Sequence, residues 1–347
     1  MRYILPVILI LCASCISAPE LGEQIRMDKK PSAPDPELPD YPEIPAEFNT
    51  LPVSSFGEIW GYLINGQEEG LSSGYPLTDI GYFGAEVDSY GRLSDVPDPQ
   101  KIGFFSGRTH LVVACNSRGL THFVIEDGSK ARERLVADLL AAVEPFDGLQ
   151  IDFELVPRND GEAFRRFLRE LRNGLGGKLL TAALPARTKE LENDVYDYRQ
   201  ILPLVDRILV MAYDEHWATS EPGPIASMDW CRSVAAYALE TLGPGKLIMG
   251  LPFYGRTWGS VNPNRAFFHS GIERIKRENN VDTVSRRDGV PTFTYEVPVS
   301  VTVFYEDEYS LATRLSMYRT MGVRSVGFWA MGQETPLVWE LLRLEAK

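Results

Sequence analysis

The octapeptide DGLQIDFE, from Asp147 to Glu154, decides both the fold and the kind of chemistry that we expect. Its residues alternate in character, since Leu149, Ile151 and Phe153 are apolar and the residues between them are polar. Successive side chains of a strand point to opposite faces. One face of this segment is therefore apolar, and the other carries an amide and two carboxylates in a row.

Helical patterns on both sides of the octapeptide place it in a parallel sheet. Apolar residues recur at helical spacing over 131–143 and over 162–175. A strand between two helices is typical of a βα unit, whose strands are usually covered on both faces. Burying an unpaired carboxylate costs free energy, so two acids on an interior face need an explanation. Catalysis is the best explanation for them.

The same alternation of strands and helices continues over the remainder of the chain. Strands are expected at 58–63, 79–87, 110–115, 148–154, 179–184, 207–213, 246–252 and 325–330. Further helices are expected at 229–242 and 308–321, although the connections after the first two strands look too irregular for full helices. The pattern predicts an α/β fold, a (β/α)8 TIM barrel spanning 51–347. Short β-like runs at about 259–304 predict a small α+β insertion between strands seven and eight.

The first 50 residues have the composition of an export signal followed by a tether. Arg2, a short apolar run and Ala13-Ser14-Cys15 are typical of a secretory signal. Residues 1–15 resemble a bacterial lipoprotein signal in which Cys15 is lipidated, although Cys12 stands where Leu is usual. Plain cleavage and a buried N-terminal strand are the alternatives. Residues 16–50 are rich in proline and predict a disordered linker, so we expect an exported lipoprotein of the bacterial cell envelope.

The overall composition limits the partners of the chain. Its 347 residues carry a formal net charge of -13 and no basic patch, so a nucleic-acid partner is not expected. Cys115 and Cys231 are expected as buried free thiols rather than as a disulfide. No CxxC pair or histidine-rich spacing predicts a metal site, and no cofactor is expected.

Acidic and aromatic residues gather where the predicted strands end. In a TIM barrel the functional side chains stand at the carboxyl ends of the strands. The segments at these ends are DFE at 152–154, MAYDEHW at 211–217, GLPFYGRTW at 250–258 and GFWAMGQE at 327–334. Carboxylates can transfer protons and aromatic rings can stack on the CH groups of a pyranose. These ends therefore predict a cleft that cleaves sugars.

These motifs resemble those of glycoside hydrolase family 18, the chitinase-like enzymes, over residues 52–347. The signatures DxxDxDxE, MxYD and a strand-eight aromatic are matched by Asp147, Gln150, Asp152 and Glu154, by Met211, Tyr213 and Asp214, and by Trp329. Gln150 stands where the family often has Asp, which leaves the pH optimum open, although its amide could still bind Asp152. The nearest resemblance is to the bacterial branch that acts on cell-wall or spore-wall sugars.

The resemblance implies a substrate-assisted retaining mechanism without a metal or cofactor. Glu154 is the acid and base, Asp152 orients the 2-acetamido group of the substrate, and Tyr213 binds that group. The substrate-binding candidates within the matched motifs are Gln150, Asp214, Trp329 and Met211. Tyr62, Tyr254 and Arg256 are further candidates from their places at the strand ends.

Simpler roles remain open for several of these residues. Asp147 is out of phase with the inward residues and is expected to be structural, while Met211 fills the barrel. Asp214 could be a turn residue, and Tyr254 and Arg256 could only pack the rim. The expected function is hydrolysis of β-linked N-acetylglucosamine-containing glycans, peptidoglycan or chitin oligomers, by a monomer. The alternative is an inactive chitinase-like lectin or scaffold of the envelope.

Overall fold

Eight parallel strands close into a barrel in the part of the chain that the computed structural model describes, residues 51–259, 265–297 and 299–346. Each strand pairs in parallel with its neighbours, and β15 closes the ring on β2. The strands, in barrel order, are β2 (Glu58–Ile64), β3 (Asp79–Val87), β5 (Arg108–Ala114), β6 (Gly148–Asp152), β7 (Leu179–Pro185), β8 (Arg207–Met211), β9 (Leu247–Pro252) and β15 (Ser325–Trp329). The predicted (β/α)8 barrel is confirmed.

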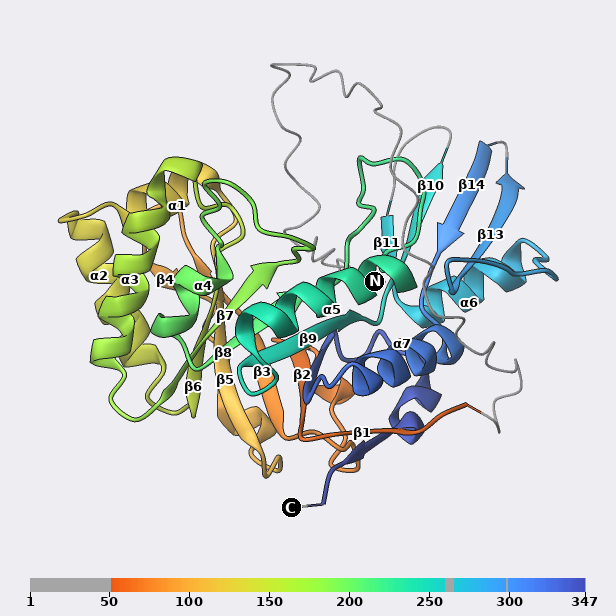
Figure 1. Ribbon diagram of the computed structural model, residues 1–347, viewed down its shortest axis with the longest axis horizontal. Coiled ribbons are helices and arrows are strands. Elements are labelled where there is room, and N and C mark those ends of the chain that lie inside the picture. The colour runs from red at the N-terminus through yellow and green to blue at the C-terminus, as the bar shows by residue number, and fades with distance from the viewer. Residues whose placement is uncertain (1–50, 260–264, 298, 347) are drawn as a thin grey trace, which may run out of the picture.

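Helices connect the strands on the outside of the barrel (Figure 1). They are α1 (Arg118–Ile125) and α2 (Lys130–Ala142) after β5, α3 (Gly161–Gly174) after β6, α4 (Tyr198–Ile201) after β7, α5 (Met228–Leu242) after β8 and α7 (Glu308–Thr320) before β15. As expected, β2 and β3 are followed instead by irregular connections. These connections contain the 3-10 turns η3 (Glu68–Gly70) and η4 (Pro99–Ile102) and the short strand β4 (Leu93–Ser94). Further 3-10 turns are η5 (Arg158–Asp160), η6 (Leu202–Leu204) and η7 (Pro336–Leu341).

The side chains on the two faces of the barrel strands pack into different hydrophobic clusters. Leu149 and Ile151 of β6 pack into the large apolar cluster between the strands and the helices. Gln150, between them, is fully buried on the inner side, where Trp60 and Tyr62 of β2 belong to a separate smaller cluster. The alternation in the sequence thus separates an apolar outer face, which holds the helices, from an inner face that can carry polar side chains.

A small α+β unit is inserted between β9 and β15 and stands to one side of the barrel (Figure 1). It is an antiparallel sheet in the order β11-β10-β14-β13-β12 with helix α6 (His269–Glu278). The strands are β10 (Gly255–Gly259), β11 (Arg265–Phe267), β12 (Ser285–Arg287), β13 (Val290–Val297) and β14 (Val299–Phe304). The unit begins at Gly255, slightly before the expected limit, because the GLPFYGRTW segment turns directly from β9 into β10.

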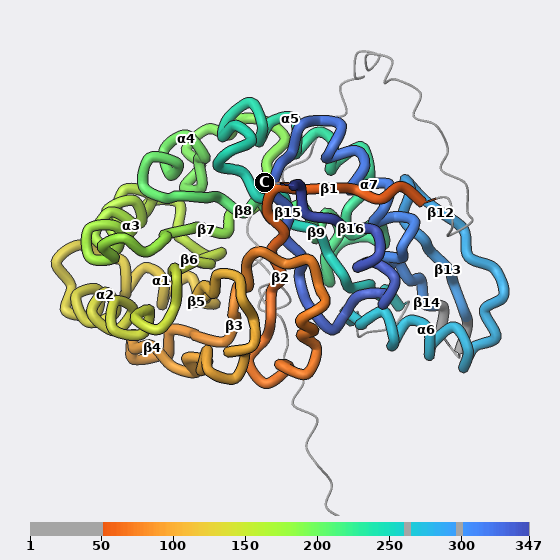
Figure 2. The backbone as a smooth tube through the Cα atoms, turned by 90° about the horizontal axis from the view of Figure 1, so that it is seen from below, coloured from red at the N-terminus to blue at the C-terminus, as the bar shows by residue number. Residues whose placement is uncertain are grey.

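The first and last described strands lie side by side (Figure 2), since β1 (Ser54–Phe56) pairs in parallel with β16 (Leu342–Leu344). The expected signal and linker at 1–50, including Cys15, lie outside the described residues, and their limits stay predictions. Among the helices that are described, none is long and apolar enough to cross a bilayer.

Candidate active site

The acids and aromatic residues named from the sequence meet at one rim of the barrel. Asp152 is the last residue of β6, Trp329 is the last residue of β15, and Tyr213 follows shortly after the end of β8. Because all eight barrel strands run in parallel, their carboxyl ends form a single rim. The strand topology alone therefore brings these side chains to the same face.

Asp152 and Glu154 form a partly buried pair of carboxyl groups. Burial, and then the charge of Glu154, raises the pKa of Asp152 well above its ordinary value. Burial, and then the charge of Asp214, raises the pKa of Glu154 to about 7. An acid that keeps its proton near neutral pH can donate it to a leaving group, so Glu154 is suited to general acid catalysis.

Asp152 has a carboxyl oxygen that forms no hydrogen bond to the part of the chain that the structure describes. Its Oδ1 is buried and has no hydrogen-bond partner among the described residues. An unpaired buried acceptor is costly, and functional sites are where such groups are retained. Asp152 therefore presents an acceptor that an N–H group of a bound substrate can satisfy.

Gln150 does not make the hydrogen bond to Asp152 that the sequence suggested. Its Oε1 accepts a hydrogen bond from the Tyr62 hydroxyl at 2.7 Å, and its Nε2 donates to Thr181 Oγ1 at 3.0 Å. The side chain is fully buried, with an exposed fraction of 0%. Gln150 therefore supports Tyr62 beneath the site, and its expected role as a substrate-binding residue stays a prediction.

Asp214 is bound by two residues of the segment that leads from β9 into β10. Its Oδ1 accepts hydrogen bonds from the Tyr254 hydroxyl at 2.6 Å and from Arg256 Nη2 at 2.7 Å. The backbone of Asp214 is in the left-handed region, with φ of 56°. Tyr254 and Arg256 are almost completely buried and orient Asp214, and whether they also bind sugar stays a prediction.

Aromatic rings line the rim around the two acids. Trp329 is partly buried and lies 5.8 Å from the Tyr62 ring and 4.9 Å from the Phe83 ring, measured between centroids. The rings of Tyr213 and Tyr254 meet edge to face at 6.4 Å. Burial raises the pKa of Tyr213 well above its ordinary value, so its hydroxyl stays protonated and can donate a hydrogen bond. Met211 packs against the inner barrel cluster, as expected of a filling residue.

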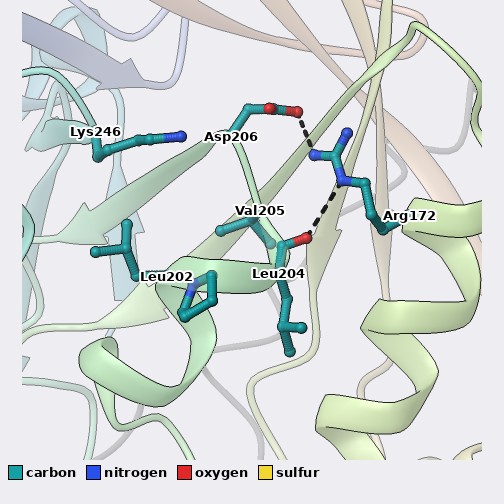
Figure 3. Close-up of a pocket in the computed structure, with 7 residues that line it drawn as sticks. Arg172, Leu202, Leu204, Val205, Asp206 and Lys246 are labelled. Carbon is teal, nitrogen blue, oxygen red and sulfur yellow. Dashed lines mark hydrogen bonds and ion pairs between the residues drawn. The ribbon is translucent and has the colours of Figure 1, made fainter.

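An open hollow of about 500 Å³ lies at the opposite end of the barrel (Figure 3). Arg172 forms an ion pair there with Asp206, which directly precedes β8, and Lys246 directly precedes β9. No aromatic residue lines this hollow, and its acid is paired with arginine. It therefore lacks the combination of protonated acid and ring faces that marks the rim.

Several residues near the site were not singled out from the sequence. Thr181 could have been found, because it stands at an inward position of β7 next to the inward position of Gln150. Phe83 lies in the middle of the expected strand 79–87 and carries no motif. Asp147 has the structural role expected of it, because its Oδ2 accepts a hydrogen bond from Thr109 N at 2.8 Å where β6 begins.

Neither a disulfide nor a cluster of candidate metal ligands is found in the described ranges. Cys115 and Cys231 are buried free thiols, as expected. No group of three or more His, Cys, Asp or Glu side chains in those ranges is placed to hold a metal ion.

Comparison with known proteins identifies the family. The model of glycosyl hydrolases family 18 matches residues 119–334, which is more than half of the chain. The chain belongs to glycosyl hydrolases family 18. It is a glycosidase by family, and enzymes of this family act on N-acetylglucosamine-containing glycans.

Relatives and solved structures agree with this family. The chain is 26% identical over 296 residues to the cortical fragment-lytic enzyme of Bacillus anthracis, covering 77% of this chain and 67% of that enzyme. The fold is similar to the Bacillus cereus spore cortex-lytic enzyme SleL, with TM-score 0.74, 23% identity, and coverage of 84% of this chain and 76% of the other. It is also similar to a chitinase from Chromobacterium violaceum, with TM-score 0.72, 23% identity, and coverage of 82% and 97%.

Proposed function

We propose that this glycosidase hydrolyses β-linked N-acetylglucosamine-containing glycans by a substrate-assisted, retaining mechanism. The observation that carries the proposal is the pair at the end of β6. Glu154 holds a proton near neutral pH, with its pKa at about 7, and Asp152 beside it presents a buried oxygen without a partner. One group can protonate the leaving oxygen while the other binds the acetamido N–H.

In the first step Glu154 donates its proton to the glycosidic oxygen, and the bond between that oxygen and the anomeric carbon breaks. The oxygen of the substrate's 2-acetamido group attacks the anomeric carbon and closes an oxazolinium ring. Asp152 accepts a hydrogen bond from the acetamido N–H and, when it is ionised in the bound complex, stabilises the positive charge. The Tyr213 hydroxyl donates to the acetamido group, and Trp329 stacks on the sugar.

In the second step Glu154, now ionised, takes a proton from water, and the water oxygen attacks the anomeric carbon. The oxazolinium ring opens, the acetamido group is restored, and the configuration is retained. Asp214 is the other acid near Glu154, but Tyr254 and Arg256 both bind its Oδ1. We therefore assign Asp214 to raising the pKa of Glu154 and not to attack on the sugar.

Peptidoglycan is the first choice of substrate and chitin oligomers the second. The relative named as a cortical fragment-lytic enzyme supports the first choice, as does the predicted lipid anchor at Cys15, which would place a monomeric enzyme on the bacterial cell envelope. The likeness to a chitinase supports the second.

Product analysis on both polymers tests this proposal. The full chain is incubated with purified peptidoglycan and with chitin oligomers, and the new reducing ends are identified by mass spectrometry. N-acetylglucosamine at the new reducing end of peptidoglycan fragments is expected. Binding to both glycans without any cleavage would contradict the proposal and favour a carbohydrate-binding scaffold.

A further inference from the structure

We propose that Tyr196, in the loop after β7, is the positioning residue that fixes Glu154 for proton transfer, an inference that rests on the proposed function of Glu154. Its hydroxyl bridges the turn that carries Glu154. The hydroxyl donates to the Phe153 carbonyl oxygen at 2.8 Å and accepts from Val156 N at 2.9 Å. These two backbone groups lie immediately on either side of the Glu154–Leu155 turn.

The turn needs such support because the barrel sheet no longer holds it. Pairing of β6 with β5 ends at Asp152, and pairing with β7 ends at Ile151. Glu154 therefore lies beyond the sheet, in a segment whose backbone carbonyl and N–H groups have no partners on a neighbouring strand. The Tyr196 hydroxyl takes the place of those partners with a single oxygen.

Tyr196 is itself fixed from three directions, so it can impose a geometry on the turn. Its backbone N donates to Asp194 Oδ1 at 3.1 Å, and Asp194 is held by Arg187 at 2.6 and 2.9 Å. The Arg187 guanidinium lies 6.0 Å from the centre of the Tyr196 ring. The ring meets Phe164 of α3 edge to face at 6.3 Å. Only 6% of the Tyr196 surface is exposed.

The turn that Tyr196 bridges carries a buried acid, so loosening this turn has an electrostatic consequence. The charged and titratable groups that act on Glu154 and its turn are Asp152, Asp214 and Tyr213 on the rim and Tyr196 itself. Burial is the largest contribution to the raised pKa of Glu154. A turn that is no longer bridged admits water, and the pKa of Glu154 then falls toward that of an ordinary glutamate.

Tyr196→Phe tests the inference, because it removes only the hydroxyl and keeps the ring. Tyr198→Phe is the matched control, since Tyr198 is equally buried and its hydroxyl donates to a backbone oxygen, Pro185 O, at 2.7 Å. Both variants should lose a similar, small amount of thermal stability. Tyr196→Phe should lower kcat by about 10- to 100-fold with little change in KM, which is the cost of a small misplacement of a catalytic group.

Two pH titrations separate positioning from simple stabilisation. In Tyr196→Phe the basic limb of the kcat profile should move to lower pH, because Glu154 must be protonated to act. The Glu154 carboxyl can also be titrated directly by 13C NMR in glutamate-labelled protein, with Glu154→Gln assigning the signal. Its pKa should fall in Tyr196→Phe and stay constant in Tyr198→Phe.

The NMR titration does not depend on catalysis, so the two proposals can fail separately. A wild-type chain that cleaves no glycan would overturn the proposed function. The pKa of Glu154 would still show whether Tyr196 positions the turn. An unchanged Glu154 pKa in Tyr196→Phe, or an equal fall in both tyrosine variants, would overturn the positioning role of Tyr196.

Discussion

Because the pKa of Glu154 is raised by burial, we expect this residue to affect stability as well as activity. Raising the pKa of Glu154 from 4.5 to about 7 corresponds to a preference of about 3 kcal/mol for the protonated form in the folded chain. The folded pKa lies above the unfolded one. The folded state therefore binds more protons between these values, and its stability falls as pH rises from 4.5 to about 7. Glu154→Gln removes this ionisation while keeping the shape of the side chain.

We expect Glu154→Gln to be more stable than the wild type at pH 8 and similar to it at pH 4.5. The difference should approach 3 kcal/mol at pH 8, which is on the order of 5 °C in melting temperature for a domain of this size. The same substitution should lower kcat by at least about 100-fold, because it removes the transferable proton. Urea unfolding at the two pH values measures the first effect, and hydrolysis of a chitin oligomer measures the second.

A matched control separates the buried acid from surface charge. Glu221 is exposed in the loop after β8, so Glu221→Gln should change neither the activity nor the pH dependence of unfolding. If Glu154→Gln and the wild type lose stability in parallel between pH 4.5 and 8, Glu154 is not the buried acid inferred from the structure. Retained activity in Glu154→Gln would refute its assignment as the acid.

Three further substitutions test separate parts of the site. Asp152→Asn should lower kcat more than it raises KM, because the charge matters most when the oxazolinium forms; steady-state kinetics with a higher KM alone would indicate simple binding. Trp329→Ala should raise KM without loss of fold, as measured by kinetics and thermal unfolding, and a collapse of the melting temperature would make it a core residue. Tyr62→Phe leaves the buried Gln150 Oε1 without its donor and should cost about 1–3 kcal/mol of unfolding free energy in urea titration, whereas no loss would show that another donor replaces it.

The strand alternation made most of the barrel predictable from the sequence. Leu149 and Ile151 face the helices and Gln150 faces the interior, as the two-residue period of a strand requires. The carboxyl ends of parallel strands share a rim, so the acids of separate motifs could be placed together without coordinates.

Contacts between side chains from different elements could not be predicted in this way. The sequence suggested that Gln150 binds Asp152. Its amide instead forms hydrogen bonds with Tyr62 of β2 and with Thr181 of β7. Tyr196 reaches the Glu154 turn from a loop without regular structure, and no periodicity marks such a residue.

The central claim is that the substrate's own acetamido oxygen attacks the anomeric carbon. The most direct test is the ratio of kcat/KM for an N-acetylated oligosaccharide to that for the same oligosaccharide with a free 2-amine at the cleaved sugar. The account predicts cleavage of the acetylated substrate and none of the amine, since the amine lacks the attacking oxygen. Equal kcat/KM values would contradict it and would place the nucleophile on the protein, with Asp214 as the first residue to test.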